Sequence, residues 1–486
     1  MLARAGARLL VVAILTAGAR AAAAAPDPAG SPTDPNVDAA PSPEEAAFPD
    51  ANFGPHYTIE EVRVTGNRKT KTDLIVGELA VLGLAPGAVV DASDPRVERA
   101  RYRLLSLGYF LDVQLSVTRG SKRGAVVLVV AVEERGTLVI NELFPATSEA
   151  TLFWGGADVS ETNFLGRGIN LGAGFVASTK PVVPYAHQGL GLRLHLGVPP
   201  LGGPNGVGLS VTGLYNDGSE FYRVSGADSD PDPGRFVATR VQRAGGVVTA
   251  GKTFPYDLHA SAALREEWVT ATYPPATAAT APIDFMINEG SSRVGTIALG
   301  LDFDNRSDPV LPRSGMRAAV SVEVGSALFG SDYGYVKTVL NGSFYLRMPR
   351  GALGFHVFGG VVDGVAPYFD RFFIGDLDLL LPRRALGINF STQPAPSFLG
   401  SSLASQRYDN YAGRLLIEYA VPVWRHKGLV YGGDAFVAAG VLGMTNDEDS
   451  LTSPPWGITG DLGIRLDTYV GVFTISIANV LSRSSF

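Results

Sequence analysis

Carboxylates gather in two loop-like segments, and side chains of this kind at close spacing are the ligands that calcium prefers. The first segment, DSDPDPG, runs from Asp228 to Gly234, and the second, NDEDS, from Asn446 to Ser450. The first does not match an EF-hand, because Pro233 stands where a glycine is required and Thr239 where the bidentate glutamate should be. Both segments are therefore interpreted as solvated loops.

The other residue types that carry chemistry lack the necessary spacing. Six histidines show no ligand pattern, cysteine is absent, and no Gly-x-Ser-x-Gly, phosphate-loop or dinucleotide-binding motif occurs. We therefore predict no catalytic, cofactor or metal site, and no enzyme. A net charge of −7, from 40 basic and 47 acidic residues, gives no reason to expect a nucleic acid as partner.

The N-terminal residues have the composition of a cleaved export signal. Arg4 and Arg8 precede a short apolar run, and five alanines close the segment over 21–25. The run is too short for a membrane-spanning helix, which needs about twenty apolar residues. We assign 1–25 to a signal peptide and 26–55, rich in Pro, Ala, Asp, Glu and Ser, to a disordered linker.

The next stretch predicts one compact module, a strand, two helices and two strands over 56–135. YTIEEVRVTG has the pattern of a strand that ends at a Gly-Asn turn, and a helix is expected over 72–82. A second helix has Asp94 as its cap, Pro95 in its first position and Gly108 after its end. YFLDVQLSV and GAVVLVVAVEE then predict two strands.

The remainder, 136–486, repeats stretches in which every second residue is apolar, and it contains no convincing helix. In GRLLIEYAV, Leu415, Ile417 and Tyr419 share one face, whereas Arg414 and Glu418 lie on the other. A soluble β sandwich also has such strands. Short connections alternate with long ones between strands of about ten residues, and this alternation favours a transmembrane antiparallel β-barrel in the outer membrane.

Several motifs resemble one known family. VRVTGNRKTKTDLI, LGLAPGAVVD and LLSLGYFLDVQLSV, ending at VAVEE, look like a POTRA domain, the periplasmic module of the BamA/TamA-type outer-membrane protein assembly family. VSETNFLGRGINLG resembles that family's second turn. LDFDNRSDPVLPRSGMRAAV resembles its later turn motif, through Asp304, Arg306, Pro309, Pro312 and Gly315.

The sequence departs from this family in a long loop that normally folds into the barrel. The family's loop carries Val-Arg-Gly-Phe, with the arginine paired to an acid on the inner wall. In FFIGDLDLLLPRRALG the arginine position falls on Leu381, and Ala438 stands where the wall aspartate is expected. The resemblance leaves as loop candidates Gly375, Arg383 and Arg384, and as wall candidates Glu418, Asp434 and Asp461. The alternative is that these are ordinary solvated charges.

The number of strands is a second departure. We count fifteen strand candidates from 136–144 to 471–481, whereas the family has sixteen. Either two strands are merged, for example within 236–254, or the closing strand is lacking.

The resemblance implies an outer-membrane protein assembly, insertion or translocation factor. The POTRA domain would capture unfolded outer-membrane or secreted client proteins by strand pairing, and the barrel seam would admit them to the membrane. Partners would be these clients, outer-membrane lipids and periplasmic accessory proteins, with the N-terminal domain in the periplasm. With a single POTRA domain, a specialised paralogue is expected. The alternatives are a two-partner-type secretion pore and a passive structural barrel.

Overall fold

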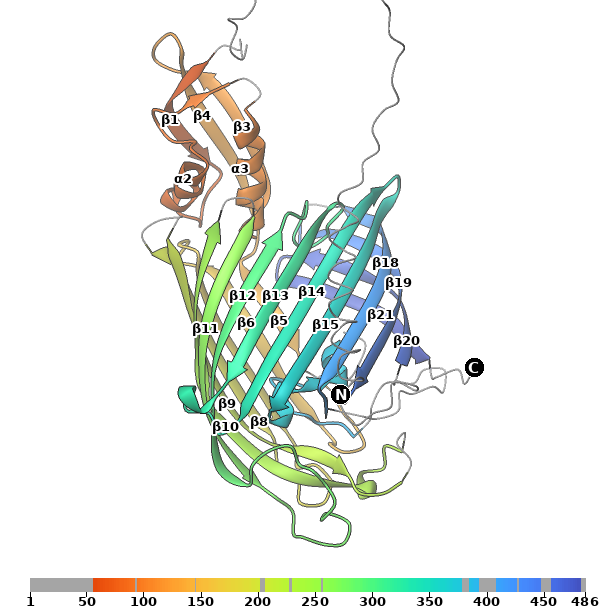
Figure 1. Cartoon of the computed structure of the whole chain (residues 1–486). Coiled ribbons are helices and arrows are strands. Elements are labelled where there is room, and N and C mark those ends of the chain that lie inside the picture. Colours follow the sequence, from red (N-terminus) through yellow and green to blue (C-terminus); the bar gives the residue numbers. More distant parts are fainter. Residues whose placement is uncertain are drawn as a thin grey trace, which may run out of the picture. The chain divides into compact units, whose positions relative to one another are not determined.

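The structure is a computed structural model, and it describes residues 56–91, 94–144, 146–201, 206–226, 230–254, 257–377, 384–392, 408–425, 428–446 and 456–481 (Figure 1). The predicted signal peptide and linker lie outside these residues, as do Arg383 and the segment NDEDS apart from Asn446. Among the described residues, no helix has both the length and the apolar character that crossing a membrane requires.

Residues 57–134 form the predicted β-α-α-β-β module. Its elements are β1 (Tyr57–Thr65), α2 (Thr72–Val81), β2 (Val89–Val90), α3 (Pro95–Ser106), β3 (Phe110–Arg119) and β4 (Ala125–Glu134). The sheet has the order β2-β1-β4-β3, in which β1 and β4 run parallel. The order leaves β3, ten residues long, at one edge of the sheet.

Local signals in the sequence explain both helices and the turns around them. Asp94 caps α3 as predicted, because its carboxylate accepts a hydrogen bond of 2.9 Å from the Arg96 backbone N–H. Gly66 follows β1 with φ +89°, and a side chain there would overlap the carbonyl of Val132. The helices cover the sheet with a single apolar core, which includes Ile59, Ile75, Leu79, Leu104 and Val130.

The rest of the described chain forms one fifteen-stranded sheet that curves into a near-closed barrel (Figure 1). Every strand pairs antiparallel with its neighbours in the sheet, and β5 and β21 are its two ends. The strands are β5 (Leu138–Leu143), β6 (Trp154–Phe164), β7 (Ile169–Ser178), β8 (Leu190–Leu201), β9 (Val207–Arg223), β10 (Phe236–Phe254), β11 (Leu258–Thr272), β12 (Gly290–Asp304), β13 (Gly315–Gly325), β14 (Gly334–Met348), β15 (Gly351–Val365), β18 (Tyr411–Arg425), β19 (Val430–Thr445), β20 (Trp456–Thr468) and β21 (Gly471–Leu481).

The count of fifteen is confirmed, and 236–254 is one continuous strand of 19 residues rather than two merged ones. The expected strand length of about ten residues is wrong for the middle of the sheet. There β9 pairs with β10 as far as Arg223 and Phe236, so both strands are longer than expected and the connection between them is shorter. Where β9 and β10 extend beyond the expected length, buried and exposed side chains alternate less regularly along them.

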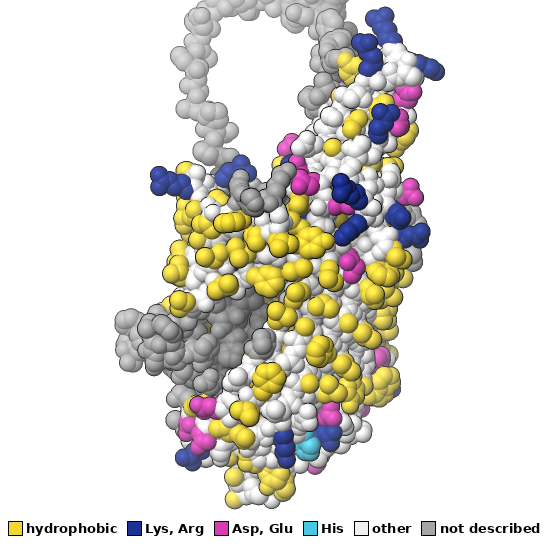
Figure 2. Space-filling model, turned by 180° about the vertical axis from the view of Figure 1, so that it is seen from behind, with side chains coloured by type: hydrophobic (Ala, Val, Ile, Leu, Met, Phe, Trp, Pro, Cys, Tyr) yellow, Lys and Arg dark blue, Asp and Glu magenta, His cyan; other side chains and the backbone are white. Residues whose placement is uncertain are grey.

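Alternation along each strand separates an outer apolar face from an inner one. In β8, Leu190, Leu192, Leu194 and Leu196 are between 41% and 68% exposed, whereas Gly191, Arg193 and His195 point to the other face. On the side of the barrel seen in Figure 2, hydrophobic side chains cover the wall and charged ones gather toward its ends. An apolar outer band of this kind fits a lipid environment.

Candidate functional site

The connection between β15 and β18 folds back into the barrel and contacts its inner wall. Its described parts are a 3-10 turn (Tyr368–Asp370), the short strand β16 (Phe372–Phe373), the helix α4 (Ile374–Leu377), the segment 384–392 and the short strand β17 (Tyr408–Asp409). β16 pairs antiparallel with β17, which joins the beginning and the end of the connection. We call this connection, 366–410, the lumenal loop.

Aromatic side chains of the lumenal loop pack against the inner faces of the barrel strands. The buried cluster combines loop residues with wall residues from β9 to β19; the loop contributes Tyr368, Phe369, Phe372, Phe373, Ile374, Leu377 and Tyr408. Gly360 in β15 makes room for this cluster, because a Cβ there would overlap the ring of Phe372. Burial of this apolar surface stabilises the loop inside the barrel.

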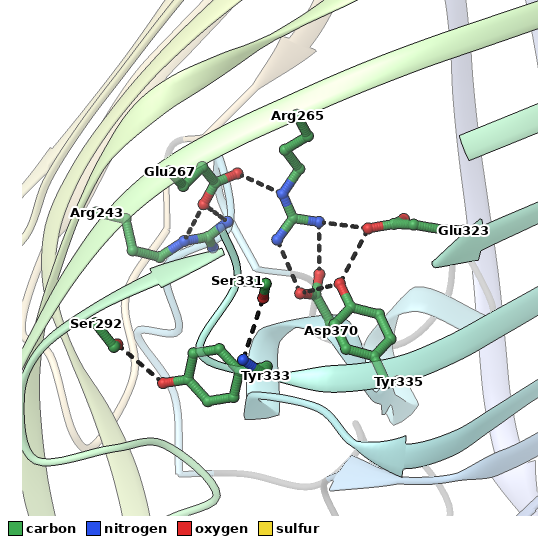
Figure 3. Close-up of polar contacts among 9 residues, drawn as sticks. All are labelled: Arg243, Arg265, Glu267, Ser292, Glu323, Ser331, Tyr333, Tyr335 and Asp370. Atoms are coloured by element: carbon green, nitrogen blue, oxygen red, sulfur yellow. Dashed lines mark hydrogen bonds and ion pairs between the residues drawn. The ribbon is translucent and has the colours of Figure 1, made fainter. Parts of the chain in front are cut away.

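A charged cluster fixes the loop beside these aromatic residues (Figure 3). Arg265 in β11 donates to both carboxylate oxygens of Asp370, at 2.9 and 2.8 Å. The same guanidinium lies 3.0 Å from Glu323 and 2.9 Å from Glu267. Arg265 thus joins the loop to two strands of the wall through bidentate, charge-assisted contacts.

Further contacts complete the charge balance around Asp370. Arg243 in β10 binds Glu267 at 2.7 Å, and its guanidinium lies 3.7 Å from the ring centre of Phe369. The hydroxyl of Tyr335 lies 2.8 Å from Asp370. The ammonium of Lys337 lies 5.2 Å from the ring centre of Phe372. Three cationic side chains, Arg243, Arg265 and Lys337, therefore accompany three carboxylates, Asp370, Glu267 and Glu323.

Two of the three loop candidates lie in the described part of the lumenal loop. Gly375 is buried in α4. The guanidinium of Arg384 lies 5.2 Å from the ring centre of Phe373 and 5.9 Å from that of Tyr408. Arg383 lies outside the described residues.

Two of the wall candidates meet arginines from the barrel itself. Glu418 accepts hydrogen bonds of 3.1 and 2.8 Å from Arg465 in β20. Asp434 pairs with Arg313, which comes from the turn between β12 and β13. The third, Asp461, lies in β20 opposite Ala438 of β19. These contacts link the predicted wall residues to neighbouring strands and a turn.

The turn motif between β12 and β13 has a local structural role. Arg306 binds Asp304 through two hydrogen bonds of 2.8 and 2.7 Å. Gly315 has φ +96°, and a Cβ there would lie 2.5 Å from the carbonyl oxygen of Asn305. Pro312 lies between them in the turn and precedes Arg313. The motif thus shapes a tight turn from which Arg313 reaches Asp434.

Sequence reasoning missed the residues of the charged cluster. The available signals were an acidic residue inside the aromatic run YFDRFF and the pair Arg265 and Glu267, which share one face of a strand. Neither signal indicates which strand the loop contacts. No group of three potential metal-ligating side chains occurs in the part of the chain that the structure describes.

Comparison with known families accounts for both parts of this architecture. The Omp85 superfamily domain matches residues 163–483, and the POTRA family described as surface antigen variable number repeat matches residues 57–135. The chain belongs to the Omp85 superfamily. Its barrel therefore lies in the outer membrane with the POTRA domain in the periplasm, and members of this superfamily are non-enzymatic assembly and secretion barrels.

Two solved structures have a similar fold at low sequence identity. CdiB from Escherichia coli matches with a TM-score of 0.58 and 11% identity, over 88% of this chain and 73% of that one. CdiB from Acinetobacter baumannii matches with a TM-score of 0.50 and 10% identity, over 87% and 74%. BamA from Haemophilus ducreyi lacking POTRA domains 1–3 gives 0.48 and 16%, over 88% and 82%. No curated protein matches the sequence.

Proposed function

We propose that this chain assembles client proteins into the outer membrane, with the POTRA domain capturing extended segments and the barrel seam admitting them. The seam is the junction of β5 and β21, the two ends of the barrel sheet. Clients are unfolded outer-membrane proteins that present unpaired strands. Three features of the molecule support this proposal: the edge of the POTRA sheet, the ends of the barrel sheet and the filled lumen.

Capture is supported by the free edge of the POTRA sheet. β3 pairs with β4 on one side and forms the edge of the sheet on the other. Its residue Val117 is exposed, and near the start of the strand the carbonyl of Val113 accepts a hydrogen bond of 2.9 Å from Arg101 of α3. An extended client segment can add to such an edge through backbone hydrogen bonds that do not depend on client sequence.

Entry into the membrane is supported by the ends of the barrel sheet. A backbone hydrogen bond of 2.7 Å joins the N–H of Ile140 to the carbonyl of Val470. The strand ladders of the sheet, however, do not connect β5 with β21. Unpaired backbone groups are costly in lipid, so the edges of these two strands favour a further strand as partner.

A client could pass through the lumen or at the seam, and the filled lumen is the observation that favours one of these two routes. The lumenal loop packs an aromatic cluster and a balanced charged cluster against the wall. Passage through the lumen, as in a secretion pore, requires breaking these contacts. Passage at the seam does not. The seam is therefore the favoured route, and a two-partner-type secretion pore remains the alternative.

Reconstitution in liposomes tests the proposal. The purified chain should accelerate folding of a client barrel, measured as the appearance of a heat-modifiable, protease-resistant client band, while the liposomes show little ion conductance. Conductance and client export without accelerated folding would instead support the secretion pore. If the chain shows neither accelerated client folding nor conductance with export, it is a passive structural barrel.

A variant lacking Tyr57 to Glu134 separates capture from entry. It removes the POTRA sheet and retains every strand of the barrel. Folding acceleration should be lost in this variant. Equal acceleration by the truncated barrel would contradict the capture step and leave entry at the seam as the only contribution.

A further inference from the structure

A second part of the lumenal loop lies on the strands β7 to β9, in a recess formed by glycines. Ala385 and Ile388 exchange backbone hydrogen bonds of 2.9 and 3.0 Å. The two residues between them, Leu386 and Gly387, have φ of +49° and +86°. Two central residues with positive φ between a bonded pair describe the tip of a tight β-hairpin. We call 385–388 the hairpin turn.

Three glycines of the wall lie beneath the hairpin turn, which also packs against the side chain of Val176 in β7. A Cβ on Gly218 of β9 would lie 2.7 Å from Ile388, and one on Gly191 of β8 would lie 3.2 Å from the same side chain. A Cβ on Gly174 of β7 would lie 3.3 Å from Leu386. These three glycines share the inner face of adjacent strands and form what we call the glycine recess.

Polar and aromatic side chains around the glycine recess contact the hairpin turn and the two residues that follow it. The side-chain amide of Asn216 donates to the carbonyl of Leu386 at 2.8 Å. The amide of Asn389 donates to Glu220 at 2.9 Å, and both side chains are buried. Phe390 stacks on Trp154 of β6, with ring centres 5.4 Å apart. The recess thus recognises a turn, an amide and an aromatic ring.

Beside the hairpin turn lies a cavity that reaches the first strands of the barrel. The cavity has a volume of about 520 Å³ and is lined by Asn141, Glu142, Asp158, Arg193, Arg384, Leu386 and Gly387. Asn141 and Glu142 belong to β5, which forms one side of the seam. Space therefore exists beside the hairpin turn, on the side from which a segment entering at the seam would arrive.

We propose that the glycine recess is a binding site for the turn of a client β-hairpin, and that the loop's own hairpin turn occupies it in competition. This inference rests on the proposed function. The favoured ligand is a two-residue β-turn with a leucine in the turn, a branched apolar residue directly after it and an aromatic residue three positions after it, as in Leu386, Ile388 and Phe390. A bulky residue in place of a recess glycine excludes both occupants.

A labelled peptide provides the test. The probe is a cyclic hairpin that carries the sequence of residues 385–390, and its control has the same residues in scrambled order. Binding is measured by fluorescence anisotropy with the full chain in detergent micelles. Asn389→Ala removes one contact of the loop's turn and leaves the recess intact. It should increase affinity for the probe about tenfold, as expected for one buried hydrogen bond to a charged group.

Two glycine variants on the same strand complete the test. Gly218→Val fills the recess and should abolish binding, also when combined with Asn389→Ala. Gly213→Val is the matched control, because no atom lies within 4 Å of a Cβ at Gly213, and it should bind like the unaltered chain. Heat-modifiable migration in gels reports whether each barrel is folded.

Three results would overturn the inference: equal binding of the scrambled peptide, no gain from Asn389→Ala, or retained binding by folded Gly218→Val. Liposome folding assays on the same preparations keep the two proposals separate. Accelerated client folding without probe binding rejects only the recess as a client site. Probe binding without accelerated folding rejects the insertion function and leaves the recess as a peptide site.

Discussion

Replacing Arg265 by methionine removes a cation that pairs with Asp370, Glu267 and Glu323 at once and leaves Arg243 and Lys337 nearby. The three buried or half-buried carboxylates then repel one another, so we expect the barrel to lose about 3–5 kcal/mol of stability. The change is measurable as a lower urea midpoint for loss of the folded band in unheated gels. Asp370→Asn should cost less, because a neutral amide can still accept from Arg265.

The matched control for that variant is Arg317→Met. Arg317 pairs with Asp302 at 2.6 Å, but its side chain is 48% exposed, so its removal should cost at most about 1 kcal/mol. If both variants unfold at the same urea concentration, the charged cluster contributes no more than a surface pair. The loop would then be held by its aromatic residues alone.

Two neighbouring glycines in β15 test the aromatic part of the site. Gly360→Val places a side chain where the ring of Phe372 lies, and overpacking of this kind costs about 1–3 kcal/mol. Gly359→Val adds the same atoms where no other atom lies within 4 Å. We expect Gly360→Val, and not Gly359→Val, to make the lumenal loop sensitive to added protease and to raise liposome conductance. Equal behaviour of the two variants would contradict the packing seen at Gly360.

Among the elements, the POTRA turn after β1 directs several backbone N–H groups to one carboxylate. Glu134, at the end of β4, accepts backbone hydrogen bonds of 2.7 to 3.1 Å from Arg68, Lys69 and Thr70. Burial alone would raise the pKa of Glu134, but these N–H groups, Thr70 first, hold its pKa below the ordinary value. A lowered pKa means that the folded state binds the proton less tightly than the unfolded state.

The sign of the pH dependence follows from that shift. The contribution of Glu134 is complete above the pKa of an unfolded glutamate, about 4.3, and is lost as the pH falls through the lower pKa of the folded state. Hydrogen exchange over residues 66–72, corrected for the intrinsic rate, should therefore show less protection at pH 3 than at pH 7. Glu134→Gln should lower protection at pH 7 and remove most of this difference. A glutamine variant with the protection of the unaltered chain would show that the turn is held by other contacts.

Elements are also the level at which the sequence is most informative. The cap at Asp94 predicts the start of α3 because it is a local interaction, and the alternating leucines of β8 predict which face meets lipid. Strand length is not local. β9 and β10 are long because they pair with each other well past the expected ends, and a single strand's sequence does not contain that information.

For the whole molecule, closure of the barrel decides which residues form the site. Asp370 and Arg265 are 105 positions apart, and only the rolled sheet and the inward course of the loop bring them together. The glycines at 174, 191 and 218 likewise form a site only in the folded chain. Their sequence pattern predicts strands, but their role as a recess depends on a loop that arrives from the other half of the chain.

The seam that results from this incomplete closure can be tested directly by cross-linking. The sequence contains no cysteine, so an introduced pair of cysteines has no other thiol of the chain to react with. Ile140→Cys with Val470→Cys joins β5 to the residue that directly precedes β21, at a pair whose backbones are already hydrogen-bonded. Oxidation should abolish accelerated client folding in liposomes, and reduction should restore it. The control pair, Ile140→Cys with Val159→Cys, joins β5 to β6 within an established ladder and should have no effect on folding activity. Unchanged activity in a fully oxidised seam variant would mean that clients enter the membrane without separating β5 from the beginning of β21, since the covalent bond prevents that movement while leaving the lumenal loop free to move.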